Sequence, residues 1–258
     1  MTSLSFTPAP GGSSRYQMVL SHARMEIRLL ARNGEQVLLA LVIPLLLLVG
    51  GAEAGTVIDL GSGRRIDVLT PGVMALAVMS TSFTSVAIAT AFERRYGVLK
   101  RLGASPLTRG SLLLGKVLSL LVVEAAQLVV ICSAALLLGW QPRGGAATAV
   151  DALLLGAAGT AAFASLGLLM AGTLRAEATL AAANLVYVVL LVAGAVVVPL
   201  SSYPHSLHAV VSALPSGALA EGLREVCSGA ALAWWRVGVL VAWAGAAGAL
   251  TVRTFRWE

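Results

Sequence analysis

The chain has 258 residues, of which 58% are hydrophobic and only 12% are charged, and its mean hydropathy is +0.88. A soluble domain cannot bury this much apolar side chain, so the composition excludes a soluble globular protein and predicts a chain that uses lipid as its solvent. The net charge of +6 does not indicate nucleic-acid binding, because the basic residues fall in short runs between apolar segments.

The N-terminal region predicts a tail followed by an interfacial helix. Residues 1–14 are polar and rich in Pro and Gly, without the apolar core of a signal peptide, and we expect a disordered tail. Over residues 15–33, apolar side chains recur within a sector of about 120° on a helix. They are Tyr16, Val19, Leu20, Ala23, Ile27, Leu30 and Ala31. Arg24, Arg28 and Arg32 line the neighbouring face, as in a helix that lies in the headgroup layer; an ordinary surface helix is the alternative.

Six segments are long and apolar enough to cross a membrane. An α-helix needs about 20 mostly apolar residues to cross about 30 Å of hydrocarbon. The six predicted spans are residues 36–54, 68–92, 117–139, 148–172, 179–199 and 234–252. Six spans put both termini on one side, which then carries thirteen of the eighteen Lys and Arg residues. The positive-inside rule places that side in the cytoplasm, and we expect a multi-pass protein of a bacterial cell membrane.

Two of the predicted connections are longer than a turn. Residues 93–116 form a basic connection on the side of the termini. Residues 200–233 lie on the opposite side and contain Pro204 and Pro215 among apolar residues at helical spacing, which predicts short helices that re-enter the outer leaflet. The sequence thus predicts an all-α integral membrane protein with one domain over residues 15–258.

Motifs for catalysis, nucleotides and metals are weak. The run from Gly110 to Lys116 matches the first part of the phosphate-loop pattern G-x-x-x-x-G-K, but Val117 replaces the Ser or Thr that holds magnesium, and no strand precedes the run. His205 and His208 share a spacing that suits a metal, but no third ligand is near in sequence. We therefore expect no catalytic residue, no metal and no cofactor in this chain.

Four polar residues stand out inside the predicted spans. Glu124 and Gln127 are three residues apart and so share a helix face in the third span, and Asn184 and Tyr187 lie in the fifth. A carboxylate in hydrocarbon costs at least about 2.5 kcal/mol, so Glu124 should face a cavity, a partner or a proton. These four residues indicate either a substrate path or subunit interface, or hydrogen bonds that only hold helices together.

Two stretches carry a resemblance to a known family. The first contains Glu93, Gly97, Leu99, Leu102, Ser105, Pro106 and the run Leu114-Gly115-Lys116. The second contains Pro199-Leu200-Ser201, Pro204, Leu214-Pro215 and Glu221-Gly222-Leu223-Arg224. In this order and on these sides of the membrane, the stretches resemble the ABC-2 type transporter permeases, the membrane subunits of one class of exporter. The chain lacks the asparagine that usually precedes the second proline.

The resemblance implies that transport and ATP hydrolysis are carried out by separate chains. It implies a permease that exports an amphiphile such as a drug, a lipid or a glycan, together with a second permease, two ATPase subunits that bind ATP and Mg²⁺, and membrane lipid. It also implies that residues 93–108 form a coupling helix that docks on the ATPase. The expected ATPase-coupling residues are Phe92, Glu93, Arg94, Arg95, Tyr96, Gly97, Leu99, Lys100, Arg101, Leu102, Ser105 and Pro106. A basic cluster that only sets topology is the alternative.

Two other functions fit the same sequence. A lipid-modifying membrane enzyme would use His205, His208 and Glu221 at the outer interface. A membrane assembly factor that transports nothing would tolerate changes at Glu93 or Pro106 without any effect on an ATPase.

Overall fold

The structure is a computed structural model that describes residues 14–32, 34–53, 64–103 and 108–254. The described residues are almost entirely helical and contain no strand; one isolated bridge joins Arg143 and Ser228. Within the described ranges, five helical segments are long and apolar enough to cross a membrane, namely Arg65–Arg95, Gly110–Leu137, Gly145–Thr173, Ala176–Ala193 and Trp234–Thr254. The chain is therefore an all-α integral membrane protein, as the sequence predicts.

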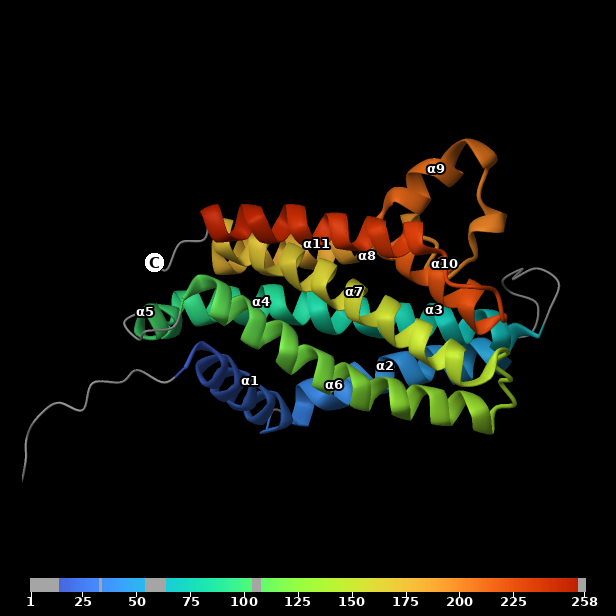
Figure 1. The fold of residues 1–258 in the computed structure, drawn as a ribbon, viewed down its shortest axis with the longest axis horizontal. Coiled ribbons are helices and arrows are strands. Elements are labelled where there is room, and N and C mark those ends of the chain that lie inside the picture. The colour runs from blue at the N-terminus through green and yellow to red at the C-terminus, as the bar shows by residue number, and fades with distance from the viewer. Residues whose placement is uncertain (1–13, 33, 54–63, 104–107, 255–258) are drawn as a thin grey trace, which may run out of the picture.

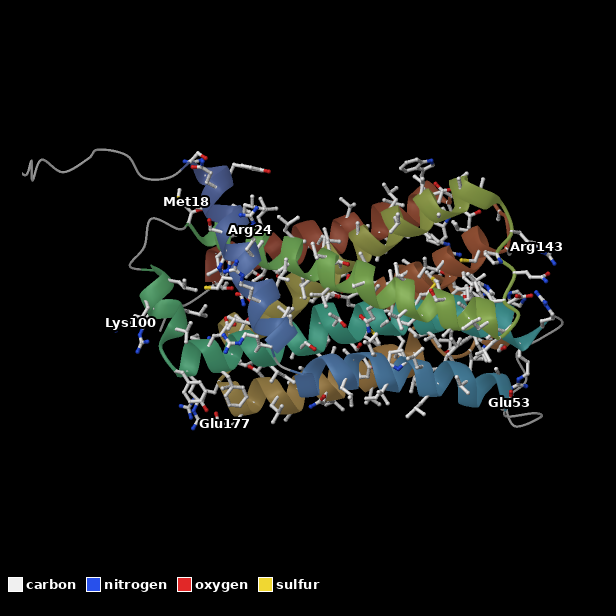
Figure 2. All side chains as sticks on the ribbon, turned by 90° about the horizontal axis from the view of Figure 1, so that it is seen from below. Met18, Arg24, Glu53, Lys100, Arg143 and Glu177 are labelled. Atoms are coloured by element: carbon white, nitrogen blue, oxygen red, sulfur yellow. The ribbon has the colours of Figure 1, made fainter. Side chains whose placement is uncertain are left out.

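The first two helices follow one another at a steep angle. Helix α1 spans Arg15–Arg32 and lies across the end of the bundle, packed mainly against α6, whereas α2 (Gly34–Glu53) runs along the bundle beside α3 (Figures 1 and 2). The apolar stretch of α2 that meets the criterion for a shorter helix is Ala40–Glu53. The predicted first span coincides with α2, and the count of six spans stays a prediction.

The second span is one continuous helix with a π-helical turn in its middle. It comprises α3 (Arg65–Met79), the π-turn η1 (Ser80–Ser85) and α4 (Val86–Arg95). This span lies at the centre of the bundle and forms most of the apolar core, together with α7 and α10. Gly97, at a positive φ of 71°, then turns the chain into the short helix α5 (Val98–Gly103).

The remaining spans enclose this centre. They are α6 (Arg109–Leu137), α7 (Gly145–Thr173), α8 (Ala176–Ala193) and α11 (Trp234–Thr254). The side chain of Thr108 caps α6 by accepting a hydrogen bond from the Ser111 amide at 3.2 Å. Helix α11 packs chiefly against α7, and α8 keeps an apolar, exposed face that suits lipid.

The predicted outer segment folds into short helices. A 3₁₀ turn (Leu200–Ser202), α9 (His205–Ala213) and α10 (Pro215–Cys227) follow α8. Pro215 opens α10, where its missing N–H is harmless. Helix α10 is buried against α3 and α7, whereas α9 stands away from the bundle (Figure 1).

The two ends of the bundle differ in what they hold. One end, called the α5 end, holds α1, α5 and the last turn of α11, and the other, called the α10 end, holds α9 and α10 (Figure 1). Arg24, Lys100 and Glu177 lie at the α5 end, and Glu53 and Arg143 lie at the α10 end (Figure 2). The first and last described residues thus share one end, as an even number of spans requires.

Candidate functional site

A buried ion cluster joins three helices at the α5 end. Lys116 of α6 donates from Nζ to Glu26 Oε1 of α1 at 2.9 Å and to Glu93 Oε1 of α4 at 3.1 Å. His22 Nε2, one turn before Glu26 on α1, lies 3.5 Å from Glu26 Oε1. These four residues are called the Lys116 cluster. It is buried, with Lys116 only 4% exposed, so α1, α4 and α6 are held together by charges that water screens little.

The stripe of α1 that faces α6 explains how the cluster forms. Val19, His22, Ala23 and Glu26 recur at a helical spacing of three and four residues and are the buried residues of α1. Gly115 of α6 admits the His22 ring, because a Cβ there would lie 2.6 Å from His22 Cδ2. Burial lowers the pKa of His22 below its ordinary value of 6.5; the nearby Lys116 acts in the same direction and Glu26 opposes it.

The predicted coupling residues fall into a buried group and an exposed group. Leu99 is fully buried against Leu112 of α6, with Met18 of α1 and Leu102 packed around them, so Leu99 anchors α5 to its own chain. Tyr96 is 67% exposed and stacks on Phe92. Lys100 and Arg101 are exposed on α5. Ser105 and Pro106 lie outside the described residues.

Two arginines attach the end of α4 to the start of α8. Arg94 donates to the carbonyl of Leu174, and Arg95 forms an ion pair with Glu177. Leu174 lies in the turn between α7 and α8, and Glu177 lies in the first turn of α8. The end of α4 thus has polar contacts both with Lys116 of α6 and with the segment that joins α7 to α8.

The polar residues of α6 are buried and hydrogen-bonded across the bundle. Glu124 contacts the hydroxyl of Thr160 on α7. Gln127 accepts from Thr81 of η1 at 3.1 Å and donates to the Ala40 carbonyl of α2 at 2.6 Å. Gln127 thus joins α6 to the π-turn and to α2, in keeping with the frequent location of π-turns at functional sites.

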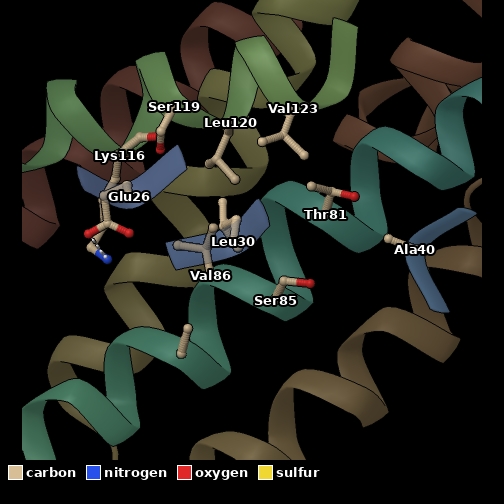
Figure 3. Close-up of a pocket in the computed structure, with 11 residues that line it drawn as sticks. Glu26, Leu30, Ala40, Thr81, Ser85, Val86, Lys116, Ser119, Leu120 and Val123 are labelled. Atoms are coloured by element: carbon tan, nitrogen blue, oxygen red, sulfur yellow. Dashed lines mark hydrogen bonds and ion pairs between the residues drawn. The ribbon is translucent and has the colours of Figure 1, made fainter. Parts of the chain in front are cut away.

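Pockets lie along the side of the bundle where α2 packs beside the second span, and two of them reach polar residues. A small one of about 60 Å³ runs from Glu26 and Lys116 to Thr81 (Figure 3). A larger one of about 240 Å³ lies between α2, the second span and α8. Asn184 and Tyr187 line this larger pocket opposite Thr84 and Ser85. Asn184 donates to the carbonyl of Leu180 one turn earlier on α8.

At the α10 end, the Glu221-to-Arg224 run stabilises the broken end of α8. The buried guanidinium of Arg224 donates to the carbonyls of Ala195 and Val196, at 2.5 and 2.6 Å, and to Glu221. Glu221 in turn accepts from the amide of Leu200 at 3.0 Å. Desolvation lowers the pKa of Arg224, opposed by the Glu221 carboxylate.

The histidines of α9 form no metal site with other ligands. His208 Nε2 lies 2.9 Å from the carbonyl of Tyr203, and the rings of His205 and His208 are 4.6 Å apart. Among the described residues, no group of three His, Cys, Asp or Glu side chains could hold a metal. Residues Gly110 to Lys116 lie within the helix α6, and two carboxylates bind the ammonium of Lys116.

Sequence reasoning missed three parts of the site. His22 and Glu26 were not singled out, although their spacing with Val19 and Ala23 carries the signal of a buried stripe. The hydroxyls of the π-turn were also missed, although five of the six residues from Ser80 to Ser85 are Ser or Thr. The carbonyl partners of Arg224 have no sequence signal, because the fold alone brings them together.

A comparison with known families matches most of the sequence to one of them. The sequence model of the ABC-2 type transporter family matches residues 16–227, which is well over half of the chain and runs from α1 to the end of α10. No curated protein matches the chain significantly. The matched region contains both the Lys116 cluster and the Glu221-to-Arg224 run. The chain therefore belongs to the ABC-2 type transporter family and is the permease component of an ABC transporter.

Proposed function

We propose that this chain is the permease subunit of an ABC exporter that moves an amphiphile across a bacterial cell membrane. It works with a second permease, of the same or a homologous kind, and with two separate ATPase subunits that bind ATP and Mg²⁺. The α5 end faces the cytoplasm and receives the ATPases. Closure of the ATPases around ATP then switches the permeases between inward- and outward-facing states.

The observation that carries this proposal is the double attachment of α5. Leu99 fixes α5 to α6 and α1 through apolar contacts, and one turn before α5 Glu93 joins the Lys116 cluster. A tightly packed core does not deform continuously but switches between alternative packings. Residues that are joined by packed side chains and buried charges therefore move together. A force applied to α5 therefore reaches α1, α4 and α6 together.

The exposed side chains around α5 form the proposed docking surface. Tyr96 presents an aromatic ring, and Lys100 and Arg101 present charges, while Leu99 faces inward. Interface centres favour aromatic residues, and charges around them orient the partner. The surface thus fits a cleft on the ATPase with an apolar floor and an acidic rim.

The proposed path for the amphiphile is the larger pocket. Its lining is mostly apolar and includes the hydroxyls of Thr84, Ser85 and Tyr187 and the amide of Asn184. Such a lining suits a substrate with both an apolar and a polar part. Because no cation or carboxylate lines this pocket among the described residues, recognition there is not expected to depend on substrate charge.

The lipid-modifying alternative gains no support from the outer segment. The Glu221 carboxylate accepts hydrogen bonds from Arg224 and from the Leu200 amide, so its contacts stabilise the fold.

Co-purification with an ATP-binding subunit tests the proposal. The permease is expressed with the ATPases of its host and purified in mild detergent, and we expect an ATP-binding subunit at equal stoichiometry. Tyr96→Ala combined with Arg101→Glu should reduce its retention at least tenfold, because one aromatic anchor and one charge are lost. Arg143→Glu, an exposed position at the α10 end, is the control. Retention that survives the double change, or that never occurs, would refute the docking role of α5.

Cysteine labelling tests the orientation. A cysteine placed at Lys100 should react with an impermeant reagent only in inside-out vesicles, and one placed at Arg143 only in intact cells. The reverse pattern would contradict a cytoplasmic α5 end.

A further inference from the structure

Glu124 is a buried carboxyl group in the middle of the third span. It is 3% exposed and faces α7 and the π-turn η1. Its Oε2 contacts the hydroxyl of Thr160, and the hydroxyl of Ser82 also interacts with this carboxyl. Its Oε1 is buried and has no hydrogen-bond partner. Among the described residues, the groups that interact with this carboxyl are therefore two hydroxyls.

The protons of both hydroxyls have another acceptor. Thr160 donates to the carbonyl of Gly156 at 2.9 Å, and Ser82 donates to the carbonyl of Val78 at 2.5 Å. A hydroxyl carries a single proton and two acceptor lone pairs. When each proton lies on its own helix, both hydroxyls present lone pairs to Glu124. These lone pairs suit a donor and would repel a carboxylate.

In the part of the chain that the structure describes, no charged group pairs with Glu124 to compensate an ionised form. None of the ion pairs of the described residues includes Glu124. Along α6 the next charged residue on the α5 side is Lys116, eight residues and about 12 Å away, and it is held by Glu26 and Glu93. On α7 the nearest acid, Asp151, precedes Thr160 by nine residues, or about 13 Å. The charged residues of α3, Arg65 and Asp67, lie at its far end.

We infer that Glu124 is a proton-binding site, and that its carboxylic acid donates a hydrogen bond to Thr160. The chain of donors then runs from the Glu124 O–H to Thr160 Oγ1, and from the Thr160 O–H to the Gly156 carbonyl. Every proton in this series of hydrogen bonds has an acceptor, and no charge is buried at Glu124 without a partner. The inference does not depend on the proposed function, because it concerns the isolated permease.

The bound proton makes Glu124 a positioning residue. It ties α6 to α7 and lies beside the π-turn, one turn away from Gln127, which binds the same turn through Thr81. Glu124 lines neither of the two pockets described above. Its proton therefore fixes how the second, third and fourth spans meet.

Infrared spectroscopy of the full-length permease in lipid nanodiscs tests the protonation state. At pH 7 we expect a protonated-carboxyl C=O band that shifts in D₂O and disappears in Glu124→Gln. Glu53→Gln, a change at an exposed acid at the end of α2, is the control and should leave the band in place. Thr160→Val should keep the band but shift it, because the acid loses its acceptor. A wild-type spectrum without the band at pH 7 would overturn the inference.

Thermal unfolding distinguishes a neutral donor from a charge. Glu124→Gln should keep Tm close to that of the wild type, because its amide NH₂ donates where the acid O–H did. Glu124→Ala should lower Tm by roughly 2–8 °C, since Thr160 loses its donor and a cavity forms. A Glu124→Gln variant that is as unstable as Glu124→Ala would show that the negative charge is needed, and would overturn the inference.

Discussion

Removing the ammonium group of Lys116 should destabilise the α5 end more than any exposed charge does. In Lys116→Met, the carboxylates of Glu26 and Glu93 lose the cation that lies 2.9 and 3.0 Å away. Breaking a buried ion pair by removing one partner costs about 3–5 kcal/mol. For a chain of this size, each kcal/mol lowers Tm by about 2–4 °C, so we expect a loss of roughly 6–20 °C.

The assay is thermal unfolding of the purified permease, with two matched variants. Lys100→Met makes the same change at an exposed position of α5 and should lower Tm by no more than about 2 °C. In Lys116→Met with Glu26→Gln and Glu93→Gln, no charge is left uncompensated, and Tm should recover towards that of the wild type. Equal Tm values for Lys116→Met and Lys100→Met would refute the role assigned to the cluster.

The pH dependence of the same variant tests the part played by His22. The pKa of His22 lies below 6.5 in the folded wild type. Just below pH 6.5 the unfolded chain therefore binds a proton at His22 that the folded chain does not bind. This contribution to stability is present above about pH 6.5 and is lost as the pH falls below it. Without Lys116, His22 can be protonated beside Glu26. The difference in Tm between Lys116→Met and wild type should therefore shrink from pH 8 to pH 6, and a constant difference would contradict this.

Two further changes test the close packing at each end of the bundle. Gly115→Ala should lower stability by about 1–3 kcal/mol, because its Cβ would meet the His22 ring at 2.6 Å. Gly110→Ala, whose Cβ would meet nothing within 4 Å, should be neutral or stabilising. Thermal unfolding of both variants tests this difference. Arg224→Met should lower stability by about 3–5 kcal/mol, since two carbonyls and the Glu221 carboxylate lose their donor, while Arg143→Met at an exposed position should change little. Equal Tm values for the two arginine variants would contradict the role of Arg224.

Hydropathy located the spans well because crossing a bilayer is a local property of the sequence. The predicted fourth and sixth spans, residues 148–172 and 234–252, lie within Gly145–Thr173 and Trp234–Thr254. The predicted fifth span, residues 179–199, runs too far, because α8 ends at Ala193. Ala195 there has a positive φ of 53°, and Arg224 binds the carbonyls that continue past the helix. An arginine 29 residues away in sequence is not visible to a local pattern.

The candidate site was harder to predict, because its polar groups satisfy one another across helices. Glu93 and Lys116 were noted as members of a family pattern, but the sequence does not show that both meet Glu26 of α1. The amphipathic pattern of α1 favoured apolar residues as its buried face. A helix that buries charges against a partner charge has a weaker apolar signal than one that buries only hydrocarbon.

The π-turn of the second span has a consequence for how its two halves are oriented. A π-turn holds about one residue more than an α-helical turn, and each residue advances an α-helix by about 100°. The face that α4 presents is therefore rotated relative to the face that an unbroken α-helix would present, and Glu93 on α4 accepts a hydrogen bond from Lys116. Deleting one residue between Ser80 and Ser85 would restore a regular helix and swing Glu93 out of its ion pair. The number of residues in this turn, more than the identity of any one of them, therefore sets how the two halves of the second span are aligned.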